Sequence, residues 1–348
     1  MMTGFNTSNR LIALFCVLFA ILVGLLGILL WQESRFPEPS EMDWVQNAVE
    51  ISDIHEPIQP IPQHLDLNPD KIALGEKLFQ EPRLSKTNTI ACISCHNLKT
   101  GGTDGRTHRR QINGETVKLN TLTVFNSGFN YKMNWYGKFD SLEAQLDEAI
   151  SNPNGMDSSW SEVLKTLGEL PDYLQEFQEV YADGMTQANV KDAIATFERS
   201  LYTPNARFDR FLLGEENAIS EEEKAGYQLF KDYGCVSCHQ GKNVGGNLFQ
   251  KFGIIGNYFA DRGQITRTNF GRFNLTGNPD DCYVFRVPSL RNITLRSPYF
   301  HDGSAPTLEA AIAVMAQYQL GRQLSAEQIQ RIVQFLETLT GEYRDQPL

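Results

Sequence analysis

The residues best suited to chemistry in this chain of 348 residues form two copies of the pattern Cys-x-x-Cys-His. The copies share the order and spacing of their reactive side chains: Cys92, Cys95 and His96 in the first, and Cys235, Cys238 and His239 in the second. Two thiols at this spacing can form thioether bonds to both vinyl groups of one haem, and the next residue then projects an imidazole toward the iron. The sequence therefore predicts two covalently bound c-type haems, with His96 and His239 as proximal ligands.

A zinc site and a redox-active dithiol are the competing interpretations of each cysteine pair. Zinc needs four ligands, so each pair would require two further Cys or His side chains arranged around it. The chain has only six histidines: His55, His64, His96, His108, His239 and His301. Haem is therefore the preferred interpretation. Cys16 and Cys282 lie outside the pattern, and we interpret them as a membrane residue and an inert core thiol.

The elements that must position these residues occur twice. Each Cys/His loop follows a Gly/Phe helix segment and precedes an amphipathic closing helix, in segments 74–79 and 190–201 for the first copy, and 225–230 and 329–339 for the second. We therefore expect a mainly α-helical fold with two cytochrome c-like haem domains in tandem. The predicted domains are residues 70–205 and 206–348, which meet near residue 205.

The N-terminal part of the chain has a different character. Residues 11–31 contain an unbroken apolar run long enough to span a membrane as a helix. Arg10 precedes the run and acidic residues follow it, which favours a cytoplasmic segment 1–10 and an exported remainder. A cleaved signal peptide is the alternative. Residues 32–69 are rich in proline and acidic side chains, which is typical of a tether.

Composition excludes several classes of protein. Hydrophobic residues make up 41% and charged residues 21% of the chain, which is enough apolar material for packed cores. The formal net charge of −11 argues against binding to nucleic acid, because phosphate neutralisation needs an excess of Lys and Arg. The acidic balance instead favours a redox partner with a basic docking face.

From about Lys71 to Glu342 the chain resembles the bacterial dihaem cytochrome c peroxidases and their relatives of the MauG type. The resemblance rests on long ordered matches: residues 97–104 after the first Cys/His loop, residues 283–292, residues 297–303, residues 315–321 and the closing stretch 335–341. It implies an enzyme on the periplasmic face of the bacterial inner membrane. The implied reaction is reduction of hydrogen peroxide with electrons from a small cytochrome c or cupredoxin, and members of the family often form homodimers.

Peroxide reduction to two waters consumes two electrons, so one haem can act as the electron store while the other keeps an openable sixth position. The resemblance assigns the store to the C-terminal domain, with Met315 as the sixth ligand. Tyr318 is the alternative, because MauG-type relatives use a tyrosine. Periodicity alone leaves a third interpretation, since Leu308, Ile312 and Met315 form a helical stripe that is typical of core packing.

The resemblance assigns peroxide chemistry to the N-terminal, peroxidatic domain. A histidine caps this iron in resting peroxidases, but the matching position here is Ile112, and His108 lies four residues earlier. The haem is therefore either capped by His108 or five-coordinate. The family's distal glutamine matches Gln145, whereas its distal glutamate matches Gly155. Asp157 is the nearest carboxylate that could substitute.

Further positions carry over from the family. Trp135 matches a tryptophan between the haems, with ordinary core packing as the alternative. Asn120 matches an oxygen ligand of a calcium ion, with the backbone carbonyls of Arg296 and Pro298 as further ligands. His301 matches a histidine that can contact a haem propionate, and we expect a structural hydrogen-bonding role for it.

Three functions are therefore compared. The leading hypothesis is a membrane-anchored periplasmic peroxidase. The second is a MauG-like oxidase that modifies a partner protein, and the third is a dihaem electron carrier without peroxide chemistry. Met315 favours the first over the second, and Gly155 favours the third over both.

Overall fold

The computed structural model describes residues 56–106, 109–110, 116–117 and 119–348. Within these residues, none of the helices combines the length and the apolar character needed to cross a membrane. The predicted segments 1–10 and 11–31 lie outside the described residues, as do His55, Cys16 and most of the predicted tether. Residues 56–348 form one compact unit, so the domain boundary near residue 205 stays a prediction.

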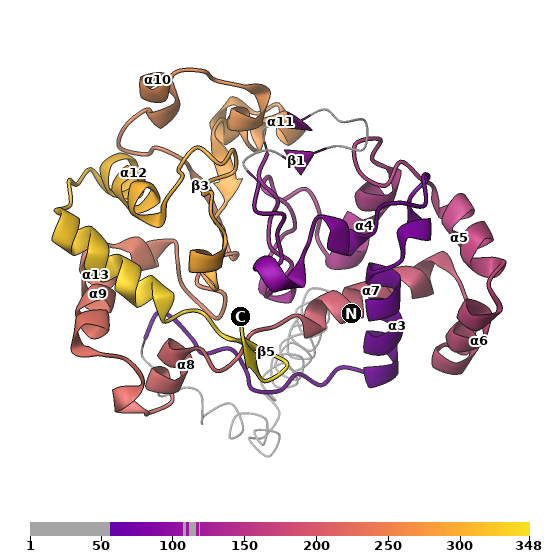
Figure 1. The fold of residues 1–348 in the computed structure, drawn as a ribbon. Helices are drawn as coiled ribbons and strands as arrows, with labels where there is room; N and C mark the ends of the chain where they lie inside the picture. Colours follow the sequence, from indigo (N-terminus) through magenta and orange to yellow (C-terminus); the bar gives the residue numbers. More distant parts are fainter. Residues whose placement is uncertain (1–55, 107–108, 111–115, 118) are drawn as a thin grey trace, which may run out of the picture. The chain divides into compact units, whose positions relative to one another are not determined.

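Helices dominate the described part of the chain, as predicted (Figure 1). In the N-terminal half they are α3 (Pro69–Phe79), α4 (Leu142–Ser151), α5 (Trp160–Gly168), α6 (Pro171–Val180) and α7 (Gln187–Ser200). In the C-terminal half they are α8 (Arg207–Leu212), α9 (Glu221–Asp232), α10 (Tyr258–Arg262), α11 (Phe273–Thr276), α12 (Leu308–Leu320) and α13 (Ala326–Glu337).

The strands of the described residues form three small antiparallel pairs. They are β1 (Arg109–Arg110) with β2 (Thr116–Val117), β3 (Phe249–Lys251) with β4 (Val284–Arg286), and β5 (Glu342–Tyr343) with β6 (Gln346–Pro347). In the second pair Gln250 lies opposite Phe285, which brings the chain just after the second Cys/His loop against β4.

The repeated Gly/Phe segments form the same helix crossing twice. In the first half α3 packs against α7, and a Cβ added at Gly75 would overlap the backbone carbonyl of Ala193. In the second half α9 packs against α13, and a Cβ at Gly226 would overlap the carbonyl of Arg331. Glycine is therefore required at both crossings because the helix backbones are in direct contact.

Aromatic side chains pack beside the glycine at each crossing. Phe79 and Phe197 lie with ring centroids 5.2 Å apart, and Phe230 and Phe335 lie 5.1 Å apart. All four side chains are buried. Each helix pair thus supplies a rigid base from which the adjacent Cys/His loop extends.

Residues Glu56–Ile61 belong to the predicted tether, residues 32–69, but they pack against the C-terminal half. Ile58 and Ile61 are buried, and the Pro57 carbonyl accepts a hydrogen bond of 2.8 Å from the Gly241 amide. The buried Arg291 guanidinium donates to the Gln59 carbonyl at 2.8 Å. This short stretch therefore belongs to the folded unit, because apolar burial and backbone pairing hold it beside the second Cys/His loop.

Substitution of Gly226 by alanine tests the helix crossing. We expect Gly226→Ala to lower the free energy of unfolding by about 3 kcal/mol, because the new methyl group must push two helix backbones apart. Gly168→Ala is the control: its Cβ would meet only the Met185 Cε atom, at 3.5 Å, so a change within about 1 kcal/mol is expected. Guanidinium denaturation of the two variants measures the difference, and equal midpoints would contradict the crossing.

Candidate haem-binding sites

The first Cys/His loop is a single tight turn. Cys92–Ser94 form a 3-10 helix, in which the Cys95 and His96 amides both donate to the Cys92 carbonyl, at 3.1 and 2.9 Å. The Ser94 hydroxyl accepts a hydrogen bond from the Ala91 amide at 3.1 Å, which fixes the start of the turn. Nδ1 of His96 lies 3.3 Å from the Gly102 carbonyl oxygen. Nδ1 is thus engaged with the backbone, which leaves Nε2 as the nitrogen for a metal.

The second loop repeats this geometry. Cys235–Ser237 form a 3-10 helix, and the Cys238 and His239 amides donate to the Cys235 carbonyl at 3.2 and 3.0 Å. Nδ1 of His239 lies 3.3 Å from the Val244 carbonyl oxygen. Burial lowers the pKa of His239 to about 4, so the imidazole is neutral and able to ligate iron.

The surroundings of the thiols argue against zinc. Burial raises the pKa of Cys92 to about 12 and that of Cys235 to about 11, which disfavours a free thiolate at both positions. Among the described residues, no group of three or more His, Cys, Asp or Glu side chains could hold a metal ion. Within the part of the chain that the structure describes, neither cysteine pair therefore has the further ligands that zinc requires.

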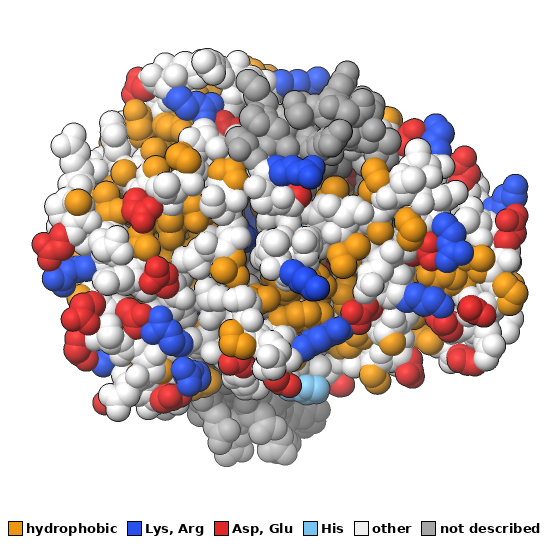
Figure 2. All heavy atoms as spheres, in the orientation of Figure 1, with side chains coloured by type: hydrophobic (Ala, Val, Ile, Leu, Met, Phe, Trp, Pro, Cys, Tyr) orange, Lys and Arg blue, Asp and Glu red, His pale blue; other side chains and the backbone are white. Residues whose placement is uncertain are grey.

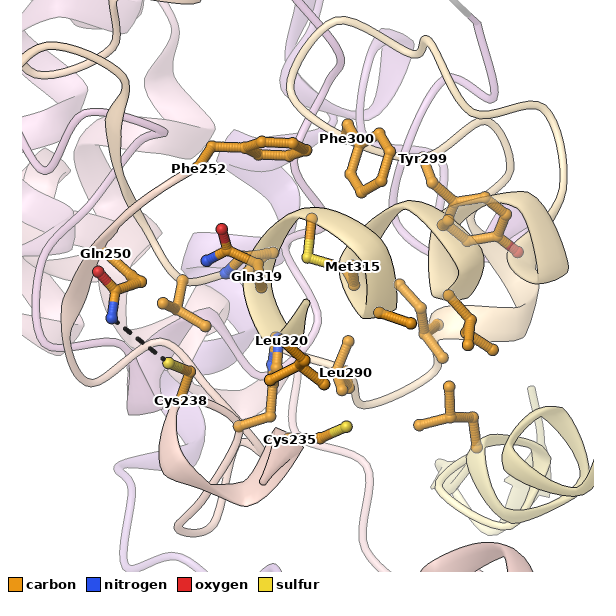
Figure 3. A pocket seen from close by; sticks show the side chains of 18 of the residues that line it. Cys235, Cys238, Gln250, Phe252, Leu290, Tyr299, Phe300, Met315, Gln319 and Leu320 are labelled. Carbon is orange, nitrogen blue, oxygen red and sulfur yellow. Dashed lines mark hydrogen bonds between the residues drawn. The ribbon is translucent and has the colours of Figure 1, made fainter. Parts of the chain in front are cut away.

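A cavity of about 200 Å³ lies beside the second loop. Cys235, Cys238, His239 and Met315 all line it. Figure 3 shows the two cysteines on the loop below and Met315 on α12 above them. Most of the remaining lining is aliphatic or aromatic, including Phe252 and Phe300. Two thiols and a neutral imidazole on one side, a thioether on the other and an apolar lining between them fit a c-type haem.

The structure separates the two candidate sixth ligands on α12. Met315 lines the cavity, whereas Tyr318 is not among the lining residues. The Tyr318 ring instead packs edge-on against Tyr258, with centroids 5.2 Å apart. The loop after β3 fixes this end of the helix, because the Ile255 amide donates to the Tyr318 carbonyl at 3.0 Å.

Trp135 and His301 also line this cavity. The Trp135 indole donates to the Asn120 carbonyl at 2.8 Å, and its ring centroid lies 6.2 Å from that of His301. Nε2 of His301 lies 2.9 Å from Nδ2 of Asn269, and the imidazole stacks on Phe285. Burial lowers the pKa of His301 to about 4, which is consistent with a neutral hydrogen-bonding residue.

The predicted calcium ligands lie partly together. The Asn120 amide group donates to the Pro298 carbonyl at 2.6 Å. The half-buried Arg296 side chain donates to the carbonyls of Ser289, Arg291 and Asn292. An Asn side chain ligates a cation through its oxygen, so the Asn120 amide would have to rotate to bind calcium. The structure thus brings Asn120 and Pro298 together, and calcium binding stays a prediction.

The predicted distal residues are not linked to one another by a hydrogen bond among the described residues. Gln145 lies half-buried on α4. The Asp157 carboxylate accepts a hydrogen bond from Lys86 at 3.0 Å, in an ion pair that is partly exposed to solvent. Asp157 is therefore already engaged, which weakens it as a substitute for the glutamate replaced by Gly155. His108 and Ile112 lie outside the described residues.

Arg286 and Glu198 are buried charged residues close to the two Cys/His loops, and sequence reasoning did not single them out. Arg286 on β4 is 3% exposed and lines the cavity beside the second loop. Glu198 on α7 is 9% exposed, and burial raises its pKa to about 8. The matched helix crossings make Glu198 the counterpart of Leu336, which lines the cavity of the second half. Alignment of the two repeats could have found Glu198. Arg286 lies in the matched stretch 283–292, but the match assigns no role to it. Cys282, expected in the core, is only half-buried.

Comparison with known proteins identifies the family. Residues 69–217 match the family model described as di-haem cytochrome c peroxidase, and residues 223–340 match the cytochrome c model. The cytochrome c551 peroxidase of Nitrosomonas europaea is 42% identical over 292 residues, which cover 84% of this chain and 86% of that protein. The cytochrome c peroxidase Ccp of Escherichia coli is 43% identical over 290 residues, which cover 83% of this chain but 62% of the relative.

Relatives of the MauG type are also similar to this chain. The methylamine utilization protein MauG of Methylorubrum extorquens is 32% identical over 81% of this chain and 82% of its own. The crystal structure of a MauG-like protein associated with microbial copper homeostasis superposes with a TM-score of 0.70 at 29% identity, covering 82% of this chain and 94% of that one.

The chain belongs to the di-haem cytochrome c peroxidase family. This confirms the resemblance seen in the sequence, the enzyme class and the tandem arrangement of cytochrome c-like halves. The family description implies two haems, in agreement with the two Cys/His loops.

Removal of the cysteines tests the attachment sites directly. We expect the unaltered chain and Cys282→Ser to carry two covalently bound haems, and Cys235→Ser/Cys238→Ser to carry only the haem of the first loop. Haem absorbance per chain and the mass of the denatured protein measure both numbers. Two haems retained in the double variant, or zinc in place of haem, would contradict the assignment.

Proposed function

We propose that this protein reduces hydrogen peroxide to water with electrons from a small cytochrome c or cupredoxin. The observation that carries this proposal is the cavity that brings His239 and Met315 to its lining beside the second of two Cys/His turns, in a chain of this family. A pair of haems supplies the two electrons that peroxide reduction consumes. The protein's own residues then decide which haem stores an electron and which meets peroxide.

The C-terminal half is proposed as the electron store. His239 and Met315 would close both axial positions, and thioether ligation raises the potential of a haem. The surroundings of Met315 support this role, because its helix is fixed at both ends. The Thr307 hydroxyl caps the start of α12 by accepting from the Ala310 amide at 3.2 Å, and near its end the Gln319 side chain accepts from the Ile254 amide at 3.2 Å.

The N-terminal half is proposed as the peroxidatic site, with His96 as the proximal ligand. The amide of Gln145 would donate a hydrogen bond to peroxide and polarise the departing oxygen. An amide cannot deliver a proton, and Gly155 carries no side chain in place of the family's glutamate. Asp157 is the proposed proton carrier. Its ion pair with Lys86 would have to open for this role, so we expect proton delivery to limit the rate.

Trp135 is proposed to carry electrons between the halves. Its indole lines the C-terminal cavity and bonds to the Asn120 backbone of the N-terminal half, so one ring lies against both parts of the fold. We also propose that calcium binds the Asn120 side chain and the backbone carbonyls of Arg296 and Pro298. The ion would then hold Asn120, which contacts Trp135, against the segment of Arg296 and Pro298 that leads to His301.

We propose that the enzyme works on the periplasmic face of the inner membrane, held by the predicted anchor 11–31. Export of the chain would agree with the periplasmic location that the family resemblance implies. On the face in Figure 2, acidic, basic and apolar side chains are interspersed, so the net charge of −11 is not gathered there. A donor would therefore meet apolar and charged groups together on this face.

A dihaem electron carrier is the second candidate, because Gly155 removes the family's distal carboxylate. A carrier needs neither Gln145 nor an open iron. The two candidates differ in whether peroxide consumes electrons that the protein holds.

Peroxide-dependent oxidation of reduced cytochrome c tests the proposed reaction. We expect the holoenzyme to oxidise two donor molecules per peroxide, and Gln145→Ala to lower kcat/KM by about 10²-fold, the usual cost of losing one donor to a developing charge. Gly155→Glu should raise the rate by at least about tenfold, because it supplies a proton carrier. Gln175→Ala, on an exposed turn of α6, is the control with no effect. Absence of peroxide-dependent oxidation in all variants would favour the carrier.

The axial ligand distinguishes a peroxidase from a MauG-like oxidase. Met315→Ala should convert the C-terminal haem from low-spin to high-spin and lower its potential, because the thioether is lost. Tyr318→Phe should change neither. Electron paramagnetic resonance and spectropotentiometry of the holoenzyme measure both effects. If Tyr318→Phe changes the spin state and Met315→Ala does not, the oxidase is favoured.

A further inference from the structure

Arg286 is a buried cation in the wall of the C-terminal cavity. Its side chain comes from β4, is 3% exposed and lines the same space as Cys238 and Met315. Nε donates to the Asn134 carbonyl at 3.1 Å, and Nη1 donates to Oδ1 of Asn130 at 2.9 Å. Both acceptors are uncharged. No carboxylate among the described residues forms an ion pair with Arg286, although burial is strong enough to lower its pKa to about 10.

Three other arginines that are buried or half-buried differ from Arg286 in their partners or in their position. Arg291 is equally buried, but it pairs with the Asp209 carboxylate at 2.7 Å. Arg262 pairs with Asp302 at 2.7 Å. Arg296 lacks a carboxylate too, but it donates to three backbone carbonyls and does not line the cavity. Burying a cation without an anion is costly, so a charge that faces a cavity implies an anionic occupant.

We propose that Arg286 binds the carboxylates of the haem in the C-terminal cavity and that its positive charge raises the reduction potential of this haem. The inference rests on the proposed attachment of that haem at Cys235 and Cys238. A guanidinium matches a carboxylate in shape and charge, and it bonds through two parallel N–H groups. The cation also favours the reduced iron, because reduction adds an electron to the nearby group.

Arg286 also connects this cavity to the N-terminal half. Its backbone amide donates to the Trp135 carbonyl at 2.9 Å, and its guanidinium bonds to Asn130 and Asn134, which lie in the segment that leads to Trp135. Asn130 is itself held by the Asn243 amide group at 2.9 Å, from the loop after His239. Arg286 is therefore a positioning residue for Trp135 as well as a partner of the haem.

Spectropotentiometry of the holoenzyme tests the proposal. We expect Arg286→Gln to disfavour reduction of the C-terminal haem by at least tenfold, which corresponds to about 59 mV for a one-electron couple. Arg286→Lys keeps the charge and should recover most of this change. Arg272→Gln is the matched control, since Arg272 pairs with Asp281 outside the cavity, and we expect a change of less than twofold.

The result that overturns the proposal is an unchanged potential in Arg286→Gln with two haems bound per chain. Haem content separates this failure from a failure of the proposed function, in which the unaltered chain would lack the second haem.

A measurement on the unaltered holoenzyme applies even if Arg286→Gln does not fold. Infrared difference spectra between the oxidised and reduced C-terminal haem should contain guanidinium bands that shift when arginine is labelled with ¹³C. Absence of arginine bands from the difference spectrum would also overturn the proposal.

Discussion

The direct contact of two helix backbones at a glycine is the constraint on which both halves of this fold depend. At Gly75 and at Gly226 any larger residue would overlap the carbonyl of the helix opposite. This approach brings the rings of Phe79 and Phe197, and those of Phe230 and Phe335, into tilted contact, and it gives each Cys/His turn a rigid base. Two thioether bonds and one histidine must reach the same haem in one orientation. The Cys/His turn can provide this orientation only if its base is rigid.

The same frame is used for different chemistry in the two halves. Position 336 of the second half is a leucine that lines the cavity, and its counterpart in the first half is the buried carboxyl of Glu198. The second half also has the thioether of Met315 and the cation of Arg286 at its cavity. Both features favour reduced iron, which suits an electron store. Asymmetry of this kind is what a reaction that consumes two electrons needs from two similar domains.

Sequence reasoning succeeded where the chemistry is local. The Cys-x-x-Cys-His turns could be predicted because five consecutive residues determine them, and the helix crossings because glycine and phenylalanine recur at fixed spacing. Helical periodicity could not show whether Met315 is a ligand or a core residue. The apolar stripe on α12 has the same spacing whether it lines a cavity or packs in a core. Contacts between distant residues were beyond prediction: Lys86 reaches Asp157, and Arg286 reaches Asn130, only because the folded chain brings them together. The packing of Glu56–Ile61 was missed because a proline-rich composition indicates a tether without showing at which residue the tether joins the folded unit.

The central claim is that one haem is closed by His239 and Met315 while the other can open to peroxide. Electron paramagnetic resonance of the half-reduced holoenzyme, recorded with and without cyanide, tests this most directly. The account predicts that the C-terminal haem takes the first electron and that the N-terminal ferric haem then binds cyanide, which changes its signal. Two low-spin six-coordinate haems, neither of which binds cyanide or peroxide after one-electron reduction, would contradict it.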